Sequence, residues 1–139
     1  VLLGEVKDSK ILGGVSFPII QLGFRSDLFE VAQLYSAVDV NVVPSFYETF
    51  GQTIIEAMAC GCPSVSFDNS GQVDVIDHKK NGYLAAYKDA ADLATGIDWV
   101  LNKADRKKLS FNARKKVEEN YSEAVVAKQY IELYRSLLK

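Results

Sequence analysis

The sequence has few of the residues that build metal centres or disulfide frameworks. Its 139 residues include two cysteines, three prolines and one histidine. Cys60 and Cys62 are separated by a single glycine, and together with His78 they are too few for a structural zinc site or a disulfide framework. We therefore expect no bound metal and a reducing compartment such as the cytosol.

The sequence also lacks a strong charge of either sign and a long apolar run. Sixteen lysines and arginines stand against eighteen acidic residues, which leaves a net charge of -2. Nowhere do the ~18 successive apolar residues that a membrane-spanning helix needs occur. We therefore expect no nucleic-acid partner and no membrane span, and any phosphate must be bound by a local feature.

The sequence contains enough apolar residues to form the core of one globular domain. The apolar fraction is 48% and the charged fraction 24%, and a chain near this size buries roughly 68–70% of its unfolded surface. The first four residues show neither a basic leader nor a cleavage site for a signal peptide. We interpret the chain, residues 1–139, as one domain cut from a larger protein.

Strand and helix patterns alternate through the first two-thirds. The segments that we expect to be strands are residues 17–22, 40–43, 64–67 and 83–86. The expected helices are a first one capped by Ser26, with its buried stripe at Leu28, Val31, Ala32 and Tyr35, then residues 52–60 and a short piece at 73–76. This alternation predicts an α/β fold, a Rossmann-like parallel sheet with helices on both faces.

The last third is predicted to be helical. Asp89 is placed to cap a helix whose buried face would be Leu93, Ala94, Ile97, Val100 and Leu101. A second helix over residues 105–120 repeats apolar residues at Leu109, Ala113 and Val117. Ser122 is expected to cap the final helix, whose apolar stripe is wider than one contact surface needs. We expect part of that stripe to need a partner.

The most informative stretch joins the expected strand at 40–43 to the helix that follows. In an open parallel sheet, ligands bind beyond the carboxyl ends of the strands. The first backbone N–H groups of the helix, around Phe50, Gly51, Gln52 and Thr53, have no helical partner and lie at its positive pole. We expect them to bind a phosphate, which Gly51 would allow to approach closely.

Two glutamates flank this helix start, with seven residues between them. Glu56 falls nearly opposite the apolar side of the helix, about one turn above its N-terminus. A carboxylate there can accept from both hydroxyls of a ribose, and Glu48 in the preceding loop can accept from the hydroxyls of a sugar beyond the phosphates. Judged by spacing alone, either glutamate is more often a solvated surface charge.

Residues 44–63 closely resemble the donor-binding motif of the group 1 (family 4) retaining glycosyltransferases of GT-B fold. That pattern has Pro-Ser, a Glu, Phe-Gly, a second Glu after seven residues, and Ala-Met-Ala followed by Gly and Pro. Further matches fall in family order at residues 22–24, 34–40, 71–76 and 81–84. The resemblance implies that the chain is the C-terminal, nucleotide-sugar-binding half of a two-domain enzyme.

The resemblance assigns roles to individual residues. It implies that Glu56 binds the nucleotide ribose, that Glu48 is the catalytic-site residue on the donor hexose, and that the backbone of residues 50–53 binds sugar and phosphate. Phe24, Arg25 and Asp27 match the segment that lies against the base. The implied reaction is transfer of a hexose from a UDP- or GDP-sugar to a hydroxyl acceptor with retention and without a metal or other cofactor. A bacterial, polysaccharide-building enzyme is the implied setting.

The chain departs from the family pattern in two ways. The basic residues that hold the diphosphate, and the N-terminal acceptor domain, precede the part of the family that this sequence matches, so we expect weak donor binding and no efficient transfer from this chain alone. Residues 69–72 also replace the usual Gly-Gly-hydrophobic turn. The expected location is the cytoplasm, with any peripheral membrane association at its inner face provided by the missing domain.

Two other functions share parts of this pattern. A sugar-nucleotide epimerase of the same architecture would use the same helix N-terminus, and a non-catalytic α/β interaction module would use none of it. His78 is expected on the surface, the cysteines are expected to be inert, and the basic residues of 103–116 are expected on a solvated helix face because acidic residues interrupt them.

Overall fold

The computed structural model describes residues 1–4 and 9–138, which form two compact units. The first unit is Val1–Leu34 and the second is Tyr35–Lys139. The second unit carries both glutamates of the motif and the helix start between them.

The first unit contains a two-stranded parallel sheet. Strand β1 (Leu2–Leu3) pairs with β2 (Gln21–Gly23), and a 3-10 helix (Ser9–Gly14) lies between them in sequence. Strand β2 is shorter than the strand expected over residues 17–22. Pro18 has no N–H to donate to a ladder, which explains why the regular strand begins only after it.

Helix α1 (Leu28–Ala37) corrects two expectations. Asp27, and not Ser26, caps it, because the Asp27 carboxylate lies one residue before the helix and accepts from the Glu30 N–H at 2.9 Å. Leu28 is 81% exposed and does not belong to the buried stripe, whereas Tyr35 at the other end is buried.

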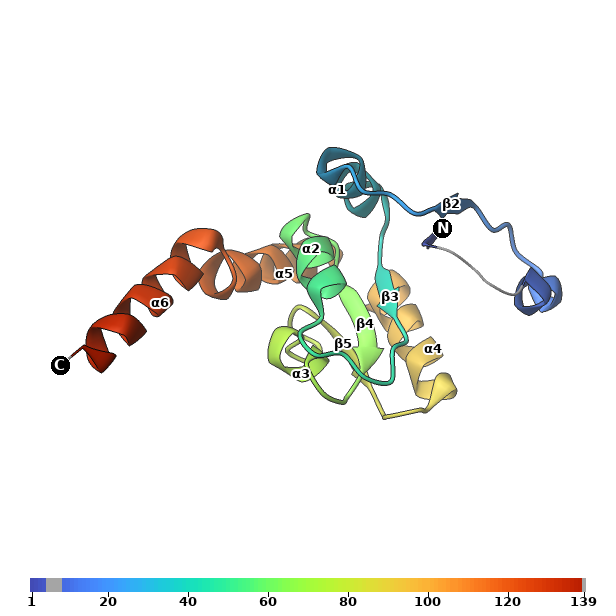
Figure 1. Cartoon of the computed structure of the whole chain (residues 1–139). Coiled ribbons are helices and arrows are strands. Elements are labelled where there is room, and N and C mark those ends of the chain that lie inside the picture. The colour runs from blue at the N-terminus through green and yellow to red at the C-terminus, as the bar shows by residue number, and fades with distance from the viewer. Residues whose placement is uncertain (5–8, 139) are drawn as a thin grey trace. The chain divides into compact units, whose positions relative to one another are not determined.

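The second unit is built on a three-stranded parallel sheet (Figure 1). Its order is β3 (Asn41–Val43), β4 (Ser64–Phe67) and β5 (Gly82–Ala85). Helix α2 (Gln52–Ala59) connects β3 to β4, and the short α3 (Gln72–Val75) connects β4 to β5. The predicted alternation of strands and helices is confirmed.

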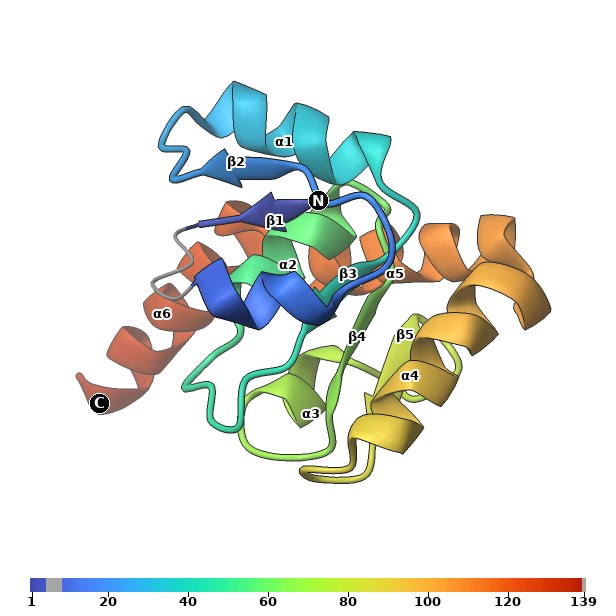
Figure 2. The same cartoon turned by 90° about the vertical axis from the view of Figure 1, so that its right-hand side faces the viewer.

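Helices cover both faces of this sheet (Figure 2). Helices α2 and α5 (Arg106–Asn120) pack together on one face, and α4 (Ala90–Asp98) packs against β4 and β5 on the other. The first core contains Val43, Ile54, Met58, Val75, Ile76, Ala113 and Val117, and the second contains Val65, Phe67, Tyr83, Ala85, Val100 and Leu109. The predicted sheet with helices on both faces is therefore confirmed.

The helix that starts with α4 is not the one regular α-helix that the sequence predicted. Asp89 caps α4 as predicted and accepts from the N–H groups of Ala91 and Asp92. A five-residue π-helix (Trp99–Lys103) then follows, and its wider turn changes the helical register. Leu101 is consequently exposed, and so is Ala94 at the edge of the α4 stripe, against the prediction for both.

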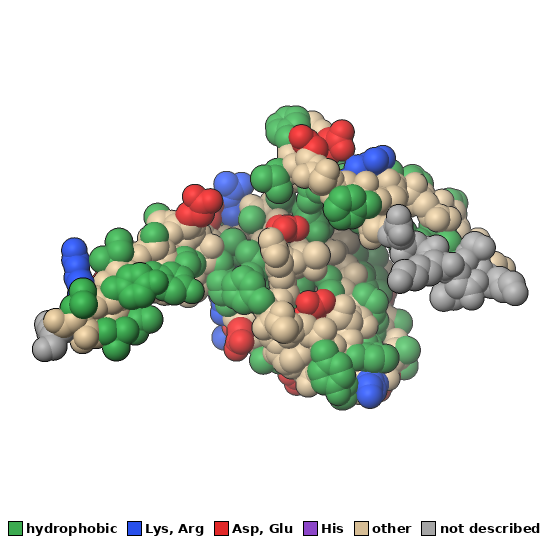
Figure 3. Space-filling model, in the orientation of Figure 1, with side chains coloured by type: hydrophobic (Ala, Val, Ile, Leu, Met, Phe, Trp, Pro, Cys, Tyr) green, Lys and Arg blue, Asp and Glu red, His purple; other side chains and the backbone are tan. Residues whose placement is uncertain are grey.

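The two long C-terminal helices differ in burial. Helix α5 buries Leu109, Ala113 and Val117, as predicted. Helix α6 (Glu123–Leu137) has no buried residue among those described, and Figure 3 shows hydrophobic side chains along it. Ser122 is the N-cap residue of α6, as predicted, but its hydroxyl donates to the Glu118 carbonyl at 2.9 Å and makes no capping hydrogen bond. None of the described helices combines the length and apolar character needed to cross a membrane.

Candidate functional site

The three strands of the second unit end at one edge of the sheet. Because β3, β4 and β5 are parallel, the segments that follow them, residues 44–51, 68–71 and 86–89, lie at that same edge. We call it the carboxyl edge. Helix α2 begins there, and ligands of open α/β sheets bind at this position.

The N-terminus of α2 is open. Gly51 is its N-cap with a φ of +80°, and no side chain among the described residues caps the helix. The Gly51 carbonyl accepts from the N–H groups of Ile54 and Ile55, while those of Gln52 and Thr53 have no acceptor in the described part of the chain. The positive φ favours glycine, and the open N–H groups form the anion-binding geometry expected from the sequence.

The loop that carries Glu48 is held by the turn at residues 69–72. The Glu48 N–H donates to the Ser70 hydroxyl at 3.1 Å, and the Glu48 carbonyl accepts from the Gly71 N–H at 2.9 Å. The side chains of Asn69 and Gln72 donate to the carbonyls of Phe46 and Ser45 at 2.7 and 3.0 Å. Four hydrogen bonds thus fix the loop from outside its own sequence.

Gly71 is required in this turn by space rather than by its φ, which is -60°. A Cβ built there would lie 2.9 Å from the carbonyl oxygen of Glu48 and from the backbone nitrogen of Phe50. Ser70 adopts a positive φ of 46°, which costs a non-glycine residue conformational energy. The turn that departs from the family pattern is therefore the structure that positions Glu48.

Glu56 is half-buried, so the sequence prediction of an outward carboxylate is only partly met. The hydroxyl of Tyr35, which is buried at the end of α1, faces this carboxylate. Burial, followed by the negative charge of Glu56, raises the pKa of Tyr35 to about 12. Tyr35 therefore remains a protonated donor beside Glu56 at neutral pH. Sequence reasoning had placed Tyr35 only in a core stripe.

Phe50 is fixed by an aromatic contact from the end of α5. Its ring lies 5.7 Å from that of Tyr121 in an edge-on arrangement. The Tyr121 hydroxyl donates in turn to the Asp74 carbonyl at 2.9 Å. The side chain of Phe50 thus anchors the start of α2. Gln52 and Thr53 are exposed, but Gly51 is buried, which contradicts the expectation that a phosphate would approach closely at Gly51.

The remaining candidate residues, Phe24, Arg25 and Asp27, belong to the first unit. The Phe24 ring is 74% exposed. Arg25 lies 3.9 Å from the Glu30 carboxylate, and the Asp27 carboxylate caps α1. Asp27 thus has a local structural role within this unit.

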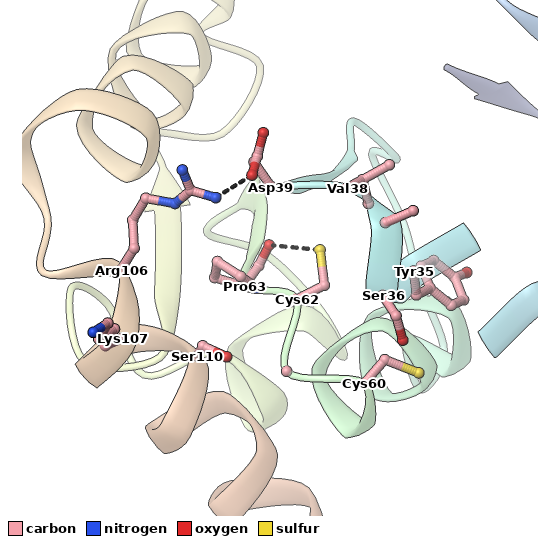
Figure 4. Close-up of a pocket in the computed structure, with 12 residues that line it drawn as sticks. Tyr35, Ser36, Val38, Asp39, Cys60, Cys62, Pro63, Arg106, Lys107 and Ser110 are labelled. Carbon is pink, nitrogen blue, oxygen red and sulfur yellow. Dashed lines mark hydrogen bonds and ion pairs between the residues drawn. The ribbon is translucent and has the colours of Figure 1, made fainter. Parts of the chain in front are cut away.

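A pocket of about 490 Å³ lies at the opposite, amino edge of the sheet (Figure 4). It is lined by residues 35–39, residues 60–63 and Arg106, Lys107 and Ser110. Arg106 pairs with Asp39 in it, and burial raises the pKa of the Cys62 thiol to about 12, so that the thiol stays protonated. Ligands of open α/β sheets bind at the carboxyl edge and not at this amino edge. The lining of this pocket also lacks the open helix N-terminus found at the carboxyl edge.

Several other titratable residues have structural partners. His78 is exposed, and its Nδ1 accepts from the Leu84 N–H at 3.2 Å. Arg114 and Lys115 pair with Glu118 and Glu119 along α5, as expected for a solvated helix face. Within the described ranges, no three His, Cys, Asp or Glu side chains are grouped to hold a metal ion.

Comparisons with known proteins identify the family of the chain. The family model described as "Glycosyl transferases group 1" matches residues 18–116. The chain is 37% identical over 88% of its length to an uncharacterized glycosyltransferase of Methanocaldococcus jannaschii, of which it covers 31%. It is 35% identical over 85% of its length to N,N'-diacetylbacillosaminyl-diphospho-undecaprenol alpha-1,3-N-acetylgalactosaminyltransferase of Campylobacter jejuni, again covering 31%.

Among solved structures, the chain is similar to Anabaena HepE in complex with UDP and glucose. The TM-score is 0.78 at 27% identity, over 92% of this chain and 34% of HepE. This likeness confirms the fold predicted for half of a GT-B enzyme. The chain spans about a third of the length of the curated relatives it matches. From the family match and the arrangement at the carboxyl edge together, the chain belongs to the group 1 glycosyl transferases.

Proposed function

We propose that this chain is the nucleotide-sugar-binding half of a retaining enzyme that transfers a hexose from a UDP- or GDP-sugar to a hydroxyl acceptor. The family match supports glycosyl transfer, and the HepE complexes with UDP and glucose and with UDP-glucose support a nucleotide-sugar ligand. The Campylobacter relative is named for transfer to a sugar on a diphospho-lipid. A role in bacterial polysaccharide biosynthesis is part of the proposal.

The observation that carries this proposal is the open N-terminus of α2 between two glutamates. The N–H groups of Gln52 and Thr53 point from the positive end of the helix, where about half an elementary charge is concentrated. A donor diphosphate bound there gains hydrogen bonds as its leaving oxygen becomes more negative. Gly51 itself is buried, so the backbone available to the diphosphate is that of the exposed Gln52 and Thr53.

Glu56 would bind the ribose of the donor. It lies four residues beyond Gln52, which at 1.5 Å rise per residue is roughly 6 Å along the helix axis. Its carboxylate can accept from both hydroxyls of the ribose diol. Tyr35 faces that carboxylate from the protein side and would keep it oriented toward the ligand.

Glu48 would bind the hydroxyls of the hexose, at the catalytic end of the donor. Its backbone is fixed by Ser70 and Gly71, so the carboxylate starts from a defined position. In the proposed reaction the bond from the anomeric carbon to the diphosphate breaks, and a bond to the acceptor oxygen forms on the same face of the sugar. The acceptor's proton leaves with the diphosphate. The proposal includes no metal.

The acceptor would be bound by a separate N-terminal domain, which is the proposed partner of this chain. That domain and the basic residues that hold the diphosphate in the family are needed for efficient transfer. We also place the enzyme in the cytoplasm, with the N-terminal domain providing any contact with the inner face of the membrane.

The proposal is tested by titrating the isotope-labelled chain with UDP and with GDP while amide shifts are followed by NMR. We expect shifts between Phe50 and Glu56. The Glu56→Ala variant should weaken binding roughly 10- to 100-fold, the equivalent of about 1.5–3 kcal/mol for hydrogen bonds to a charged group. Glu119→Ala, which removes an exposed carboxylate of α5, is the matched control. Unchanged affinity in Glu56→Ala would falsify the ribose assignment.

A further inference from the structure

Four aromatic rings gather at the carboxyl edge beside the Glu48 loop. Phe46 and Tyr47 follow β3, Phe67 ends β4, and Tyr87 follows β5. Ring centroids of Phe46, Tyr47 and Phe67 lie 6.1, 6.1 and 6.4 Å from that of Tyr87, and those of Phe46 and Phe67 are 5.8 Å apart. Phe67 is buried, so the cluster rests on the core of the second unit.

The other three rings, which we call the aromatic platform, face solvent. Phe46 is 49%, Tyr47 74% and Tyr87 37% exposed. Figure 3 shows hydrophobic side chains with a basic side chain beside them at the lower end of the second unit. An exposed ring is usually free to rotate, but here each ring packs against another. Rigid rings present contact area at little cost in conformational entropy.

Lys88 completes this platform at its edge. Its Nζ lies 5.2 Å from the Phe46 centroid and 4.9 Å from the Tyr87 centroid. The residue adopts a positive φ of 63°, a conformation that costs energy in a non-glycine residue. The Lys88 side chain thus places an ammonium donor over two exposed rings.

The platform also adjoins the proposed sugar-binding end of the site. Tyr47 directly precedes Glu48, and the Phe46 carbonyl is one of the groups that the turn at 69–72 holds. The ribose and diphosphate are assigned to Glu56 and the start of α2, whereas the platform shares its loop with Glu48, the residue proposed to bind the hexose. Of the proposed parts of the donor, the hexose is therefore the one assigned next to the platform.

We propose that Phe46, Tyr47, Tyr87 and Lys88 form a binding surface for a pyranose ring, an inference that rests on the proposed function. The apolar C–H face of a pyranose fits the electron-rich face of an aromatic ring, and its hydroxyls can accept from the Lys88 ammonium and the tyrosine hydroxyls. The pyranose is either the donor hexose or a sugar unit of the acceptor.

The test uses methyl α-D-glucopyranoside as the probe, titrated into the isotope-labelled chain and followed by amide shifts. We expect shifts at Phe46, Tyr47, Tyr87 and Lys88. Sorbitol, which carries similar hydroxyls on an open chain, should cause none. Tyr47→Leu should weaken binding at least about five-fold, the loss expected for one aromatic contact. Phe111→Leu, which alters an exposed ring on α5, should bind as the native chain does.

Lys88→Met gives a second, independent readout, because it removes the ammonium but keeps an apolar chain near the rings. This variant should weaken binding of the glucoside and leave the amide shifts caused by UDP unchanged. Equal shifts with sorbitol, or native affinity in both Tyr47→Leu and Lys88→Met, would overturn the proposal. UDP alone shifting the platform amides would also overturn it, since the rings would then stack a base.

Comparing UDP-glucose with UDP identifies the source of the pyranose. Platform shifts that appear with UDP-glucose and not with UDP assign the donor hexose, whereas shifts with the glucoside alone assign a sugar of the acceptor. Failure of the proposed function has a different signature: UDP and GDP then leave the amides of Phe50 to Glu56 unmoved, whatever the glucoside does at the platform.

Discussion

The two edges of the three-stranded sheet belong to the same strands, but their polar groups differ in whether they have partners within the protein. At the carboxyl edge, the N–H groups of Gln52 and Thr53 are open, and aromatic rings face solvent beside Lys88. At the amino edge, Cys62 and Pro63 are buried, and Arg106 is paired with Asp39. The second arrangement satisfies its groups internally, while the first leaves them available to a ligand. This difference is why we place the proposed function at the carboxyl edge, although a sizeable pocket lies at the other edge.

Among substitutions at the two edges, we expect Gly71→Ala at the carboxyl edge to have the largest effect on UDP affinity and stability. The added Cβ would lie 2.9 Å from backbone atoms of Glu48 and Phe50, so the loop must move. We expect the affinity for UDP to fall about ten-fold and the free energy of unfolding to fall by about 1–3 kcal/mol, as for other overpacked sites. NMR titration and urea denaturation measure the two effects.

Gly13→Ala is the control for this variant, because nothing lies within 4 Å of a Cβ built at Gly13. Native UDP affinity in Gly71→Ala would show that the turn at 69–72 does not position the binding loop. The proposal that the carboxyl edge binds the ligand would then lose this support.

A smaller effect is expected at the amino edge from Arg106→Ala. The side chains of Arg106 and Asp39 are 51% and 61% exposed, and exposed ion pairs contribute about 0.2–1 kcal/mol. The free energy of unfolding should fall by no more than that in urea denaturation, and UDP affinity should not change. A loss of UDP binding comparable to that of Gly71→Ala would move the functional site toward this edge.

The smallest effect on binding is expected from modifying the thiols of the amino edge. Because burial raises the pKa of Cys62 from 9.0 to about 12, iodoacetamide at about pH 8 should leave Cys62 unlabelled in the folded chain and label it in concentrated urea. Mass spectrometry of the peptides separates it from the half-buried Cys60. Rapid labelling of Cys62 in the folded chain would contradict the buried environment.

The raised pKa of Cys62 also determines how the free energy of unfolding changes with pH. The unfolded thiol ionises above about pH 9, whereas the folded thiol does so only near 12, so the unfolded state is favoured increasingly between these values. The contribution of Cys62 to stability is therefore complete below pH 9 and falls as the pH rises. Cys62→Ala should reduce this alkaline loss in urea denaturation.

Local signals in the sequence were sufficient for much of the second unit. Strand β4 begins and ends where predicted, Gly51 and Gly61 flank α2, and Asp89 caps α4. These features depend on neighbouring residues and on hydrophobic periodicity. The predicted cap at Ser26 was wrong because the neighbouring Asp27 makes the bond, and Ser122 is the N-cap residue of α6 but uses its hydroxyl on the preceding helix.

The interactions that shape the site could not be predicted from local pattern. The hydrogen bonds between the Glu48 loop and residues 69–72 join residues 22 to 27 positions apart, and a hydroxyl or amide has many possible partners. Tyr35 looked like a core residue because its ring is apolar, and only the fold shows its hydroxyl facing Glu56. The π-helix at Trp99–Lys103 likewise had no distinct sequence signal.

The turn at residues 69–72 has a consequence for how such enzymes diversify. It reaches the Glu48 loop through the backbone, with Ser70 and Gly71 bonded to the two sides of the same residue. A substitution in this turn would tilt the glutamate without altering any group assigned to the ligand. If Glu48 binds the hexose as proposed, a substitution in this turn would change sugar preference through the backbone, and aligning the proposed ligand contacts alone would miss it.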